Sequence, residues 1–181
     1  CLGFMDFYKN SITIPLWCDY AVRVGPIGTE KLSWKSSDGI TDAVVHPTFQ
    51  RGEEYLPNKN YAHLKVHSAW QFKCKDDIPF SFQGAFWNFE HPEQVLIPPG
   101  VLNFKHQNAV VNVFLALKQN NEIHLSSGDP LLMFTPLSEK NVNIKTHLID
   151  EGEWKRIHDK TMYVSSFSGF YKKNKLRCPF K

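Results

Sequence analysis

The sequence predicts an all-β protein of the β-sandwich or jelly-roll kind, and three observations support this class. Short apolar runs bounded by Gly, Pro, Asn and Asp recur along most of the chain, as expected for many short strands. Apolar residues at helical spacing are scarce and occur near the C-terminus. Aromatic residues make up 14% of the chain, which excludes a mainly disordered protein because disordered segments contain few aromatics.

Length, charge and cysteine content narrow the class further. A chain of 181 residues corresponds to one domain, and a domain of this size can bury roughly 70% of its unfolded surface. No apolar run approaches the roughly 20 residues of a membrane span, so we expect no membrane contact. The net charge of +3 is too small to require nucleic acid as a partner. The cysteines form no C-x-x-C pair, so no zinc-ribbon or thioredoxin motif is indicated.

The first third of the chain predicts short strands followed by a loop. Pro15 lies within the first apolar run and cannot donate a hydrogen bond to a neighbouring strand, so this run predicts an edge strand or a bulge. Residues 47–62 are polar and contain Pro and Gly, which predicts a long loop. The predicted strands are 12–17, 20–24, 31–34 and 41–46.

The middle of the chain predicts further strands at 63–67, 70–74, 80–86, 95–97 and 101–104. Alternation at 63–67 places His63, Lys65 and His67 on one face. Two histidines four residues apart on a strand are separated by about 13 Å, too far to share one metal ion. We therefore predict both histidines as surface residues.

The most hydrophobic stretch, 109–117, is rich in β-branched residues and predicts a central strand. The turn residues after it predict a hairpin between 110–117 and 122–125. Residues 131–135 predict a buried strand ended by a proline. Alternating apolar residues at 142–148 predict a last strand.

A single helix is predicted at 150–160, with Asp150 as its N-cap. The residues after it show no regular pattern. We therefore divide the chain into one β-rich domain at 1–160 and an irregular basic arm at 161–181.

The arm contains a cluster of basic residues and, from residue 171 onward, no acidic residue. One interpretation is a solvated tail, and the other is a contact for nucleic acid or an acidic partner. The residues concerned are Lys172, Lys173, Lys175 and Arg177.

Two short motifs flank the strand at 110–117: Gly100-Val101-Leu102-Asn103 and Gly128-Asp129-Pro130-Leu131. This arrangement is similar to the C-terminal half of the dUTPase-type β-clip, with its G-V-I-D turn and G-D-R-I-A-Q strand. The resemblance implies a related β topology and a small-ligand or nucleotide site near Asn103 and His106. Asn103 replaces the family's Asp and cannot activate water as a carboxylate does, so hydrolase activity is not implied.

A broader resemblance, covering most of the chain, is to uncharacterised proteins of tailed bacteriophages and some bacteria. It implies a phage origin and no particular activity. The family's Cys segment is internal, so the resemblance implies that further residues precede Cys1. The motifs that carry it are Cys1-Leu2-Gly3-Phe4, Trp70-Gln71-Phe72-Lys73-Cys74, Gly100 to Asn103, Gly128 to Pro136, and Phe170-Tyr171-Lys172-Lys173-Asn174.

The strongest enzyme hypothesis comes from His91-Pro92-Glu93, which has the H-x-[DE] spacing of the facial triad in Fe(II)/2-oxoglutarate oxygenases. His147 and then Arg156 follow at separations similar to those of the distal His and the cosubstrate Arg. In this interpretation His91, Glu93 and His147 bind iron. The competing interpretation is chance, because the chain contains 8 histidines.

Aromatic residues supply a second candidate site. Trp70, Trp87 and the neighbouring Asn88 could line a ligand pocket or an interface, for instance for a sugar or base. Aromatics at alternating strand positions more often pack in the core, so that interpretation stays open as well.

The sequence contains no G-x-S-x-G, P-loop or dinucleotide-binding glycine motif. We therefore predict a non-enzymatic phage β-sandwich that acts through protein–protein contacts or self-association without a cofactor. Its expected role is that of a virion structural or assembly component, in the virion or the host cytoplasm. The alternatives are an oxygenase using Fe(II) and 2-oxoglutarate, and a ligand-binding β-clip protein.

Overall fold

The computed structural model describes residues 2–26, 31–39, 43–45, 61–85, 94–105 and 110–156. These residues form one N-terminal helix, eleven strands and a helical segment at 151–156. All strand pairs are antiparallel. The all-β class predicted from the sequence is therefore confirmed.

The helix is α1 (Leu2–Lys9). The strands are β1 (Ile12–Pro15), β2 (Tyr20–Val24), β3 (Leu32–Ser36), β4 (Ala43–Val45), β5 (Tyr61–Gln71), β6 (Pro79–Gly84), β7 (Val95–Leu96), β8 (Gly100–Asn103), β9 (Val110–Lys118), β10 (Asn121–Leu125) and β11 (Pro130–Pro136).

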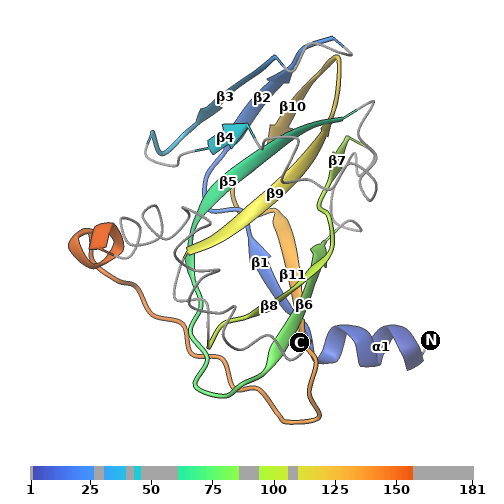
Figure 1. The fold of residues 1–181 in the computed structure, drawn as a ribbon, viewed down its shortest axis with the longest axis vertical. Helices are drawn as coiled ribbons and strands as arrows, with labels where there is room; N and C mark the ends of the chain where they lie inside the picture. Colours follow the sequence, from blue (N-terminus) through green and yellow to red (C-terminus); the bar gives the residue numbers. More distant parts are fainter. Residues whose placement is uncertain are drawn as a thin grey trace, which may run out of the picture.

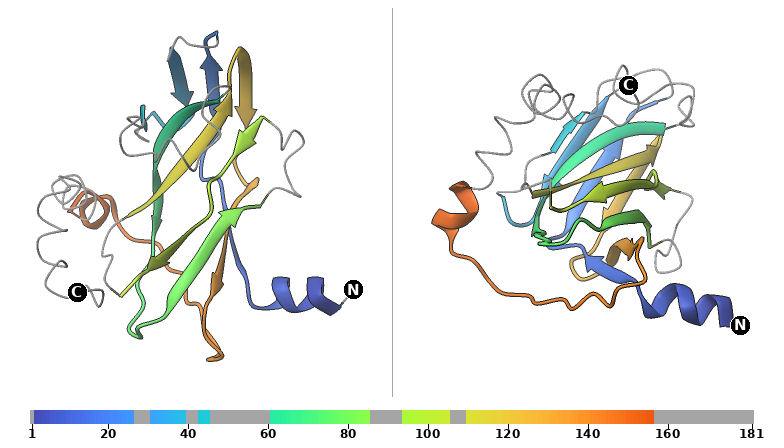
Figure 2. Two further views of the ribbon diagram at one scale, coloured as in Figure 1. Left: turned by 45° about the vertical axis from the view of Figure 1, so that its right-hand side comes forward. Right: turned by 60° about the horizontal axis from the view of Figure 1, so that its bottom comes forward.

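The strands form three sheets. We call them the lower sheet (β1-β11-β6-β8), the upper sheet (β10-β2-β3) and the front sheet (β4-β5-β9-β7). The lower and upper sheets are linked at the corner where β1 leads into β2 and β10 into β11. There Leu16 N donates to Asp129 O at 2.7 Å, and Gly128 N donates to Leu16 O at 2.9 Å. The front sheet lies over this bent layer, giving a sandwich-like arrangement (Figure 1) that Figure 2 shows from two further directions.

The core lies between the two layers and draws on all three sheets. Val22 of the upper sheet, Leu64 of the front sheet and Phe134 of the lower sheet are each 0% exposed. Phe134 also belongs to a cluster of phenylalanine rings whose contacting pairs have centroids between 5.0 and 6.0 Å apart, formed by Phe72, Phe80, Phe82, Phe104 and Phe134. Much of the aromatic excess in the sequence is thus used for packing.

Two strand predictions are confirmed in detail. β1 is an edge strand of the lower sheet, and its register with β11 shifts between Ile14 and Pro15, as the proline predicts. β9 lies between β5 and β7, which is the central position expected for the most hydrophobic stretch.

The predicted hairpin between 110–117 and 122–125 is wrong. β9 pairs with β5 on one edge and β7 on the other, whereas β10 pairs with β2. The turn at Asn120 (φ 60°) takes the chain from the front sheet to the upper sheet, and Asn120 N donates to Gly25 O at 2.9 Å. Asparagine tolerates this left-handed backbone conformation, so the sequence correctly predicts a turn here. It does not reveal which sheet the strand after the turn joins.

Two further expectations need correction. The strands predicted at 63–67 and 70–74 belong to one strand, β5, which has an irregular register between His67 and Gln71 and ends at Gln71, so that residues 72–74 are not in a strand. The strand predicted at 142–148 is absent: this part of the chain is extended and, in the described structure, pairs with no strand. Alternating side chains form a strand only where a sheet edge is available to accept it.

The C-terminal helix begins as predicted. Asp150 Oδ1 accepts a hydrogen bond from Glu153 N at 2.7 Å, which is the N-cap arrangement, and Lys155 Nζ lies 2.7 Å from Glu151 Oε1. The continuation of this helix to residue 160 and the basic arm at 161–181 lie outside the described residues.

Candidate functional site

Helix α1 is the element that sequence reasoning missed. Two of its C-terminal carbonyls accept hydrogen bonds from Ser11, whose N donates to Tyr8 O at 3.1 Å and whose Oγ donates to Phe7 O at 2.6 Å. The same Oγ lies 2.8 Å from Thr135 Oγ1 on β11. Ser11 therefore ends the helix and ties it to the lower sheet.

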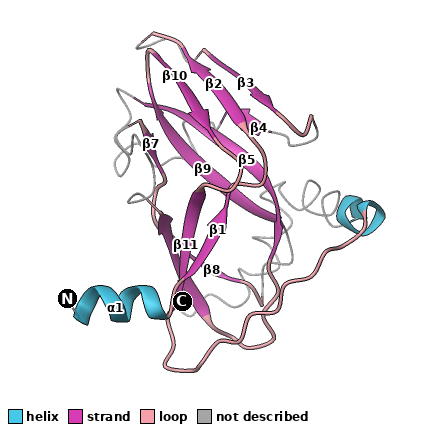
Figure 3. Cartoon of the chain, turned by 180° about the vertical axis from the view of Figure 1, so that it is seen from behind, coloured by secondary structure: helices cyan, strands magenta, loops and turns pink. Residues whose placement is uncertain are grey.

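The helix itself leaves the sandwich, as Figure 1 and the opposite view in Figure 3 show, and none of its residues is buried. At 100° per residue, four large apolar side chains fall on one side, while Asp6 and Lys9 fall on the other. Phe4 is 52% exposed and Met5 66% exposed. We call Phe4, Met5, Phe7 and Tyr8 the apolar face of α1.

The aromatic rings on this face contact one another. Phe4 and Tyr8, one turn apart, stack with centroids 6.3 Å apart and planes inclined by 8°. Phe7 and Tyr8 meet edge to face at 5.4 Å. Because these rings already restrict one another, a partner that covers them orders few additional side-chain torsions.

A second exposed apolar segment follows the lower sheet. Residues 141–150, which we call the exposed arm, run away from the sandwich in an extended conformation (Figure 2). Val142 packs against the core, whereas Ile144 is 54% exposed and Leu148 is 100% exposed. The arm thus presents aliphatic side chains to solvent.

Trp70, predicted in a ligand pocket or interface, links two sheets. Its ring packs against the core, and its Nε1 donates to Pro15 O at 3.0 Å. The bond joins β5 of the front sheet to the irregular end of β1. Trp87 and Asn88, predicted beside it, lie outside the described residues.

Asn103, the centre of the predicted nucleotide site, is engaged within the protein. Its Nδ2 donates to Asp77 Oδ1 at 2.6 Å, and its Oδ1 accepts from Lys105 N at 3.1 Å. Lys105 Nζ also lies 4.0 Å from Asp77 Oδ2. The side chain of Asn103 therefore holds the turn after β8 against the loop that connects β5 to β6. His106 lies outside the described residues.

The proposed iron ligands are only partly within the structure. His147 lies exposed on the arm, and His91 and Glu93 fall outside the described residues. In the part of the chain that the structure describes, no group of three or more His, Cys, Asp or Glu could hold a metal ion. The basic residues Lys172, Lys173, Lys175 and Arg177 are also outside the described ranges.

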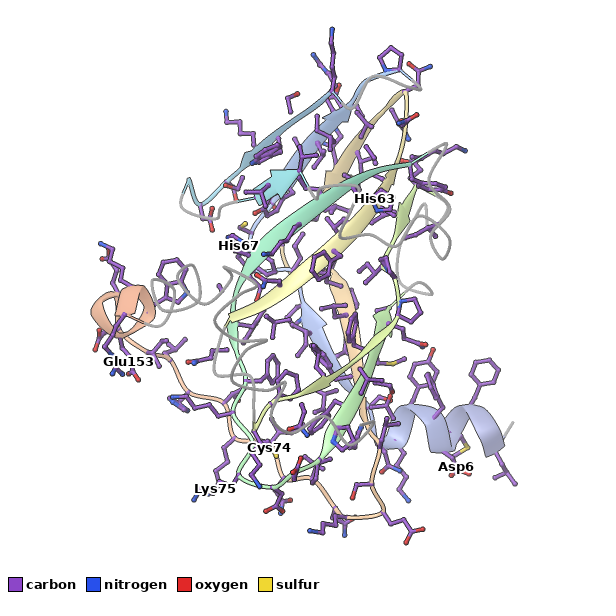
Figure 4. The ribbon with its side chains drawn as sticks, in the orientation of Figure 1. Asp6, His63, His67, Cys74, Lys75 and Glu153 are labelled. Carbon is purple, nitrogen blue, oxygen red and sulfur yellow. The ribbon has the colours of Figure 1, made fainter. Side chains whose placement is uncertain are left out.

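The prediction that His63 and His67 are surface residues is wrong, because each is only 5% exposed. The alternation is correct: both point away from the core side of β5, in register with Ala116 and Asn112 of β9. Figure 4 labels them on β5. Alternation identifies which side chains share a face, but not whether that face is covered. We call this side of β5 and β9 the outer face.

None of the helices in the described residues has the length and hydropathy of a membrane span. Comparison with protein-family models, curated proteins and solved structures gave no match. The candidate sites are therefore judged on their own geometry.

The sequence did contain a signal for α1. Phe4 and Tyr8 are spaced by four residues, and Leu2 and Met5 by three, which is helical spacing. The run is only eight residues long, shorter than the window in which helical periodicity becomes distinct.

Proposed function

We propose that this protein is a non-enzymatic contact module on a jelly-roll-like β-sandwich, which assembles with other copies of itself. The observation that carries the proposal is α1, a helix whose apolar face is exposed and whose residues are all unburied. A contiguous group of exposed apolar side chains is typical of an interaction site.

A second copy of the chain is the partner that we propose. Each copy carries two kinds of exposed apolar surface: the aromatic face of α1 and the aliphatic side chains of the exposed arm. Closed symmetric assemblies of identical chains are the commonest oligomers. The resemblance to tailed-phage proteins is consistent with this role, because virion and assembly components act in many copies, in the virion or the host cytoplasm.

The expected size of the interface requires both elements. A helix of eight residues is about 12 Å long, and a stable interface buries at least roughly 1,000 Å². The helix alone is too short to supply this area. Ile144 and Leu148 extend the apolar surface, so we propose that the exposed arm, residues 141–150, contacts the neighbouring copy as well.

The test is the oligomeric state measured by light scattering during gel filtration over a range of concentrations. We expect the wild-type chain to form a discrete oligomer and the double variant Phe4→Ser/Met5→Ser to be a monomer. Asp6→Ser is the matched control, because Asp6 lies on the opposite side of the same helix, and it should remain oligomeric. A monomeric wild type, or a double variant that assembles as the wild type does, would overturn the proposal.

A further inference from the structure

The outer face contains a half-buried cation, Lys65, that has no counter-ion among the described residues. Lys65 lies between His63 and His67 on β5 and opposite Phe114 on β9. Within the described part of the chain, neither a carboxylate nor a hydrogen-bond acceptor contacts its ammonium. Burial lowers the pKa of the Lys65 ammonium. An anion bound beside it would compensate for the lost hydration.

A second polar group on the same face also lacks a partner. Asn112 Oδ1 is buried, and it accepts no hydrogen bond in the described structure. Asn112 is in direct register with His67, so it occupies the same face as Lys65. Most buried polar atoms in folded proteins are hydrogen-bonded, and an exception requires an explanation such as an absent ligand.

The positions of Lys65 and Asn112 on neighbouring strands allow one ligand to contact both side chains. Lys65 is opposite Phe114, two residues along β9 from Asn112, so Lys65 and Asn112 are diagonal neighbours. Diagonal positions on antiparallel strands are roughly 7–8 Å apart. This separation is that of the strand positions, and the flexible lysine side chain can place its ammonium within hydrogen-bond reach of an oxyanion that also contacts Asn112.

The hydrogen-bonding requirements select the ligand class. Lys65 offers donors and a positive charge, whereas Asn112 Oδ1 accepts and needs a donor. We propose that the outer face binds a small oxyanion of the phosphate or phosphate-monoester class between Lys65 and Asn112. Inorganic phosphate carries a P–O–H group in both ionic forms that are present at neutral pH, and a phosphate monoester carries one in its monoanion, below its second pKa of about 6. One such anion can therefore satisfy both side chains.

The neighbouring side chains fit such a ligand. His63 and His67 are buried on either side of Lys65 and can donate hydrogen bonds to an oxyanion. Phe114 is half-buried opposite Lys65 and offers an apolar surface to an organic substituent. The site is separate from α1, so this inference stands or falls independently of self-association.

The test is NMR titration of the 15N-labelled chain with inorganic phosphate and with sulfate at matched ionic strength and neutral pH. We expect phosphate to shift the Asn112 side-chain amide signals saturably. Sulfate should bind at least about tenfold more weakly, because it carries no proton to donate to Asn112 Oδ1. Adenosine monophosphate identifies the source: tighter binding than phosphate indicates a nucleotide, and equal or weaker binding indicates free phosphate.

Variants supply the second readout. Lys65→Met should weaken phosphate binding at least about tenfold, because it removes a charge-assisted hydrogen bond. Lys35→Met is the matched control: it removes an exposed lysine from β3 and should bind phosphate as the wild type does. Equal binding of sulfate and phosphate by the wild type, a comparison that needs no variant to fold, would overturn the proposal. Unchanged phosphate binding by Lys65→Met would also overturn it.

Discussion

Gly100 shows how a single residue constrains the lower sheet. It lies opposite Phe82 in the register of β8 with β6, and a Cβ at this position would come within 2.6 Å of the Phe82 ring. The ring also packs against Phe134, with centroids 6.0 Å apart, which limits its movement. Glycine is therefore needed here for space, because its φ lies outside the left-handed region.

We expect Gly100→Ala to lower the free energy of unfolding by roughly 1–3 kcal/mol through overpacking. Urea unfolding measures the change. Gly3→Ala is the control, since a Cβ there meets no atom within 4 Å, and it should not destabilise the protein. Combining Gly100→Ala with Phe82→Leu should recover part of the loss; a Gly100→Ala protein as stable as the wild type would contradict the steric argument.

The side chain of Glu122 is the clearest electrostatic feature at the surface. Arg23 Nη2 donates to Glu122 Oε2 at 3.0 Å, and this hydrogen bond and the positive charge lower the pKa of the carboxyl. His124 Nε2 lies 3.4 Å from Glu122 Oε1. A carboxyl with a lowered pKa stabilises the fold above its unfolded pKa, and the contribution disappears as pH falls through the folded pKa. Exposure to solvent keeps this contribution small.

We expect Arg23→Met to raise the pKa of Glu122 toward its ordinary value, because the hydrogen bond and most of the neighbouring charge are lost. A 13C NMR titration of the carboxyl measures it directly. Lys35→Met removes a cation from β3, which pairs with the strand of Arg23 but not with β10, and it should leave the titration unchanged. An unchanged Glu122 titration in Arg23→Met would show that Arg23 does not control the carboxyl.

At the scale of the elements, a side-chain hydrogen bond joins β5 of the front sheet to β1 of the lower sheet. Trp70 Nε1 donates to Pro15 O, which lies where the β1 register is irregular. Because the bond crosses between the front and lower sheets, it helps to set the position of one layer against the other.

We expect Trp70→Phe to cost about 1 kcal/mol of unfolding free energy, because a ring remains but the Pro15 carbonyl loses its donor. Trp34→Phe is the matched control: Trp34 is also partly buried against the core, but no hydrogen bond of its indole occurs in the described structure. Thermal unfolding of both variants measures the difference. Equal destabilisation by the two substitutions would mean that ring volume, and not the hydrogen bond, accounts for the loss.

At the scale of the whole molecule, α1 and the sandwich are separable in stability. The helix buries none of its residues, and the hydroxyl contact between Ser11 and Thr135 ties its C-terminal end to β11. Burial of apolar surface dominates stability, so the helix contributes little to it.

Deletion of residues 1–9 should therefore leave the melting temperature of the monomeric sandwich nearly unchanged while abolishing self-association. Differential scanning calorimetry at low concentration and light scattering at high concentration measure the two effects. The chain carrying Asp6→Ser serves as the control that assembles. A large drop in melting temperature at low concentration would contradict the separation of roles.

The candidate sites were predictable to different degrees. Alternation placed His63, Lys65 and His67 on one face, but their burial depends on what covers that face, which periodicity does not encode. Asn112 lies 47 residues after Lys65 in sequence, and only the pairing of β5 with β9 makes them neighbours. The apolar face of α1 was spaced for a helix, but its exposure depends on where the helix lies.

Local chemistry determined the β class, the edge position of β1 through Pro15, and the N-cap at Asp150, because each follows from the conformational limits or hydrogen bonding of residues adjacent in the chain. Tertiary structure alone decided that β10 pairs with β2 rather than β9, and that the alternating residues of the exposed arm form no strand. The physical reason is that strand pairing needs a vacant sheet edge. Which edges are vacant depends on residues far apart in sequence.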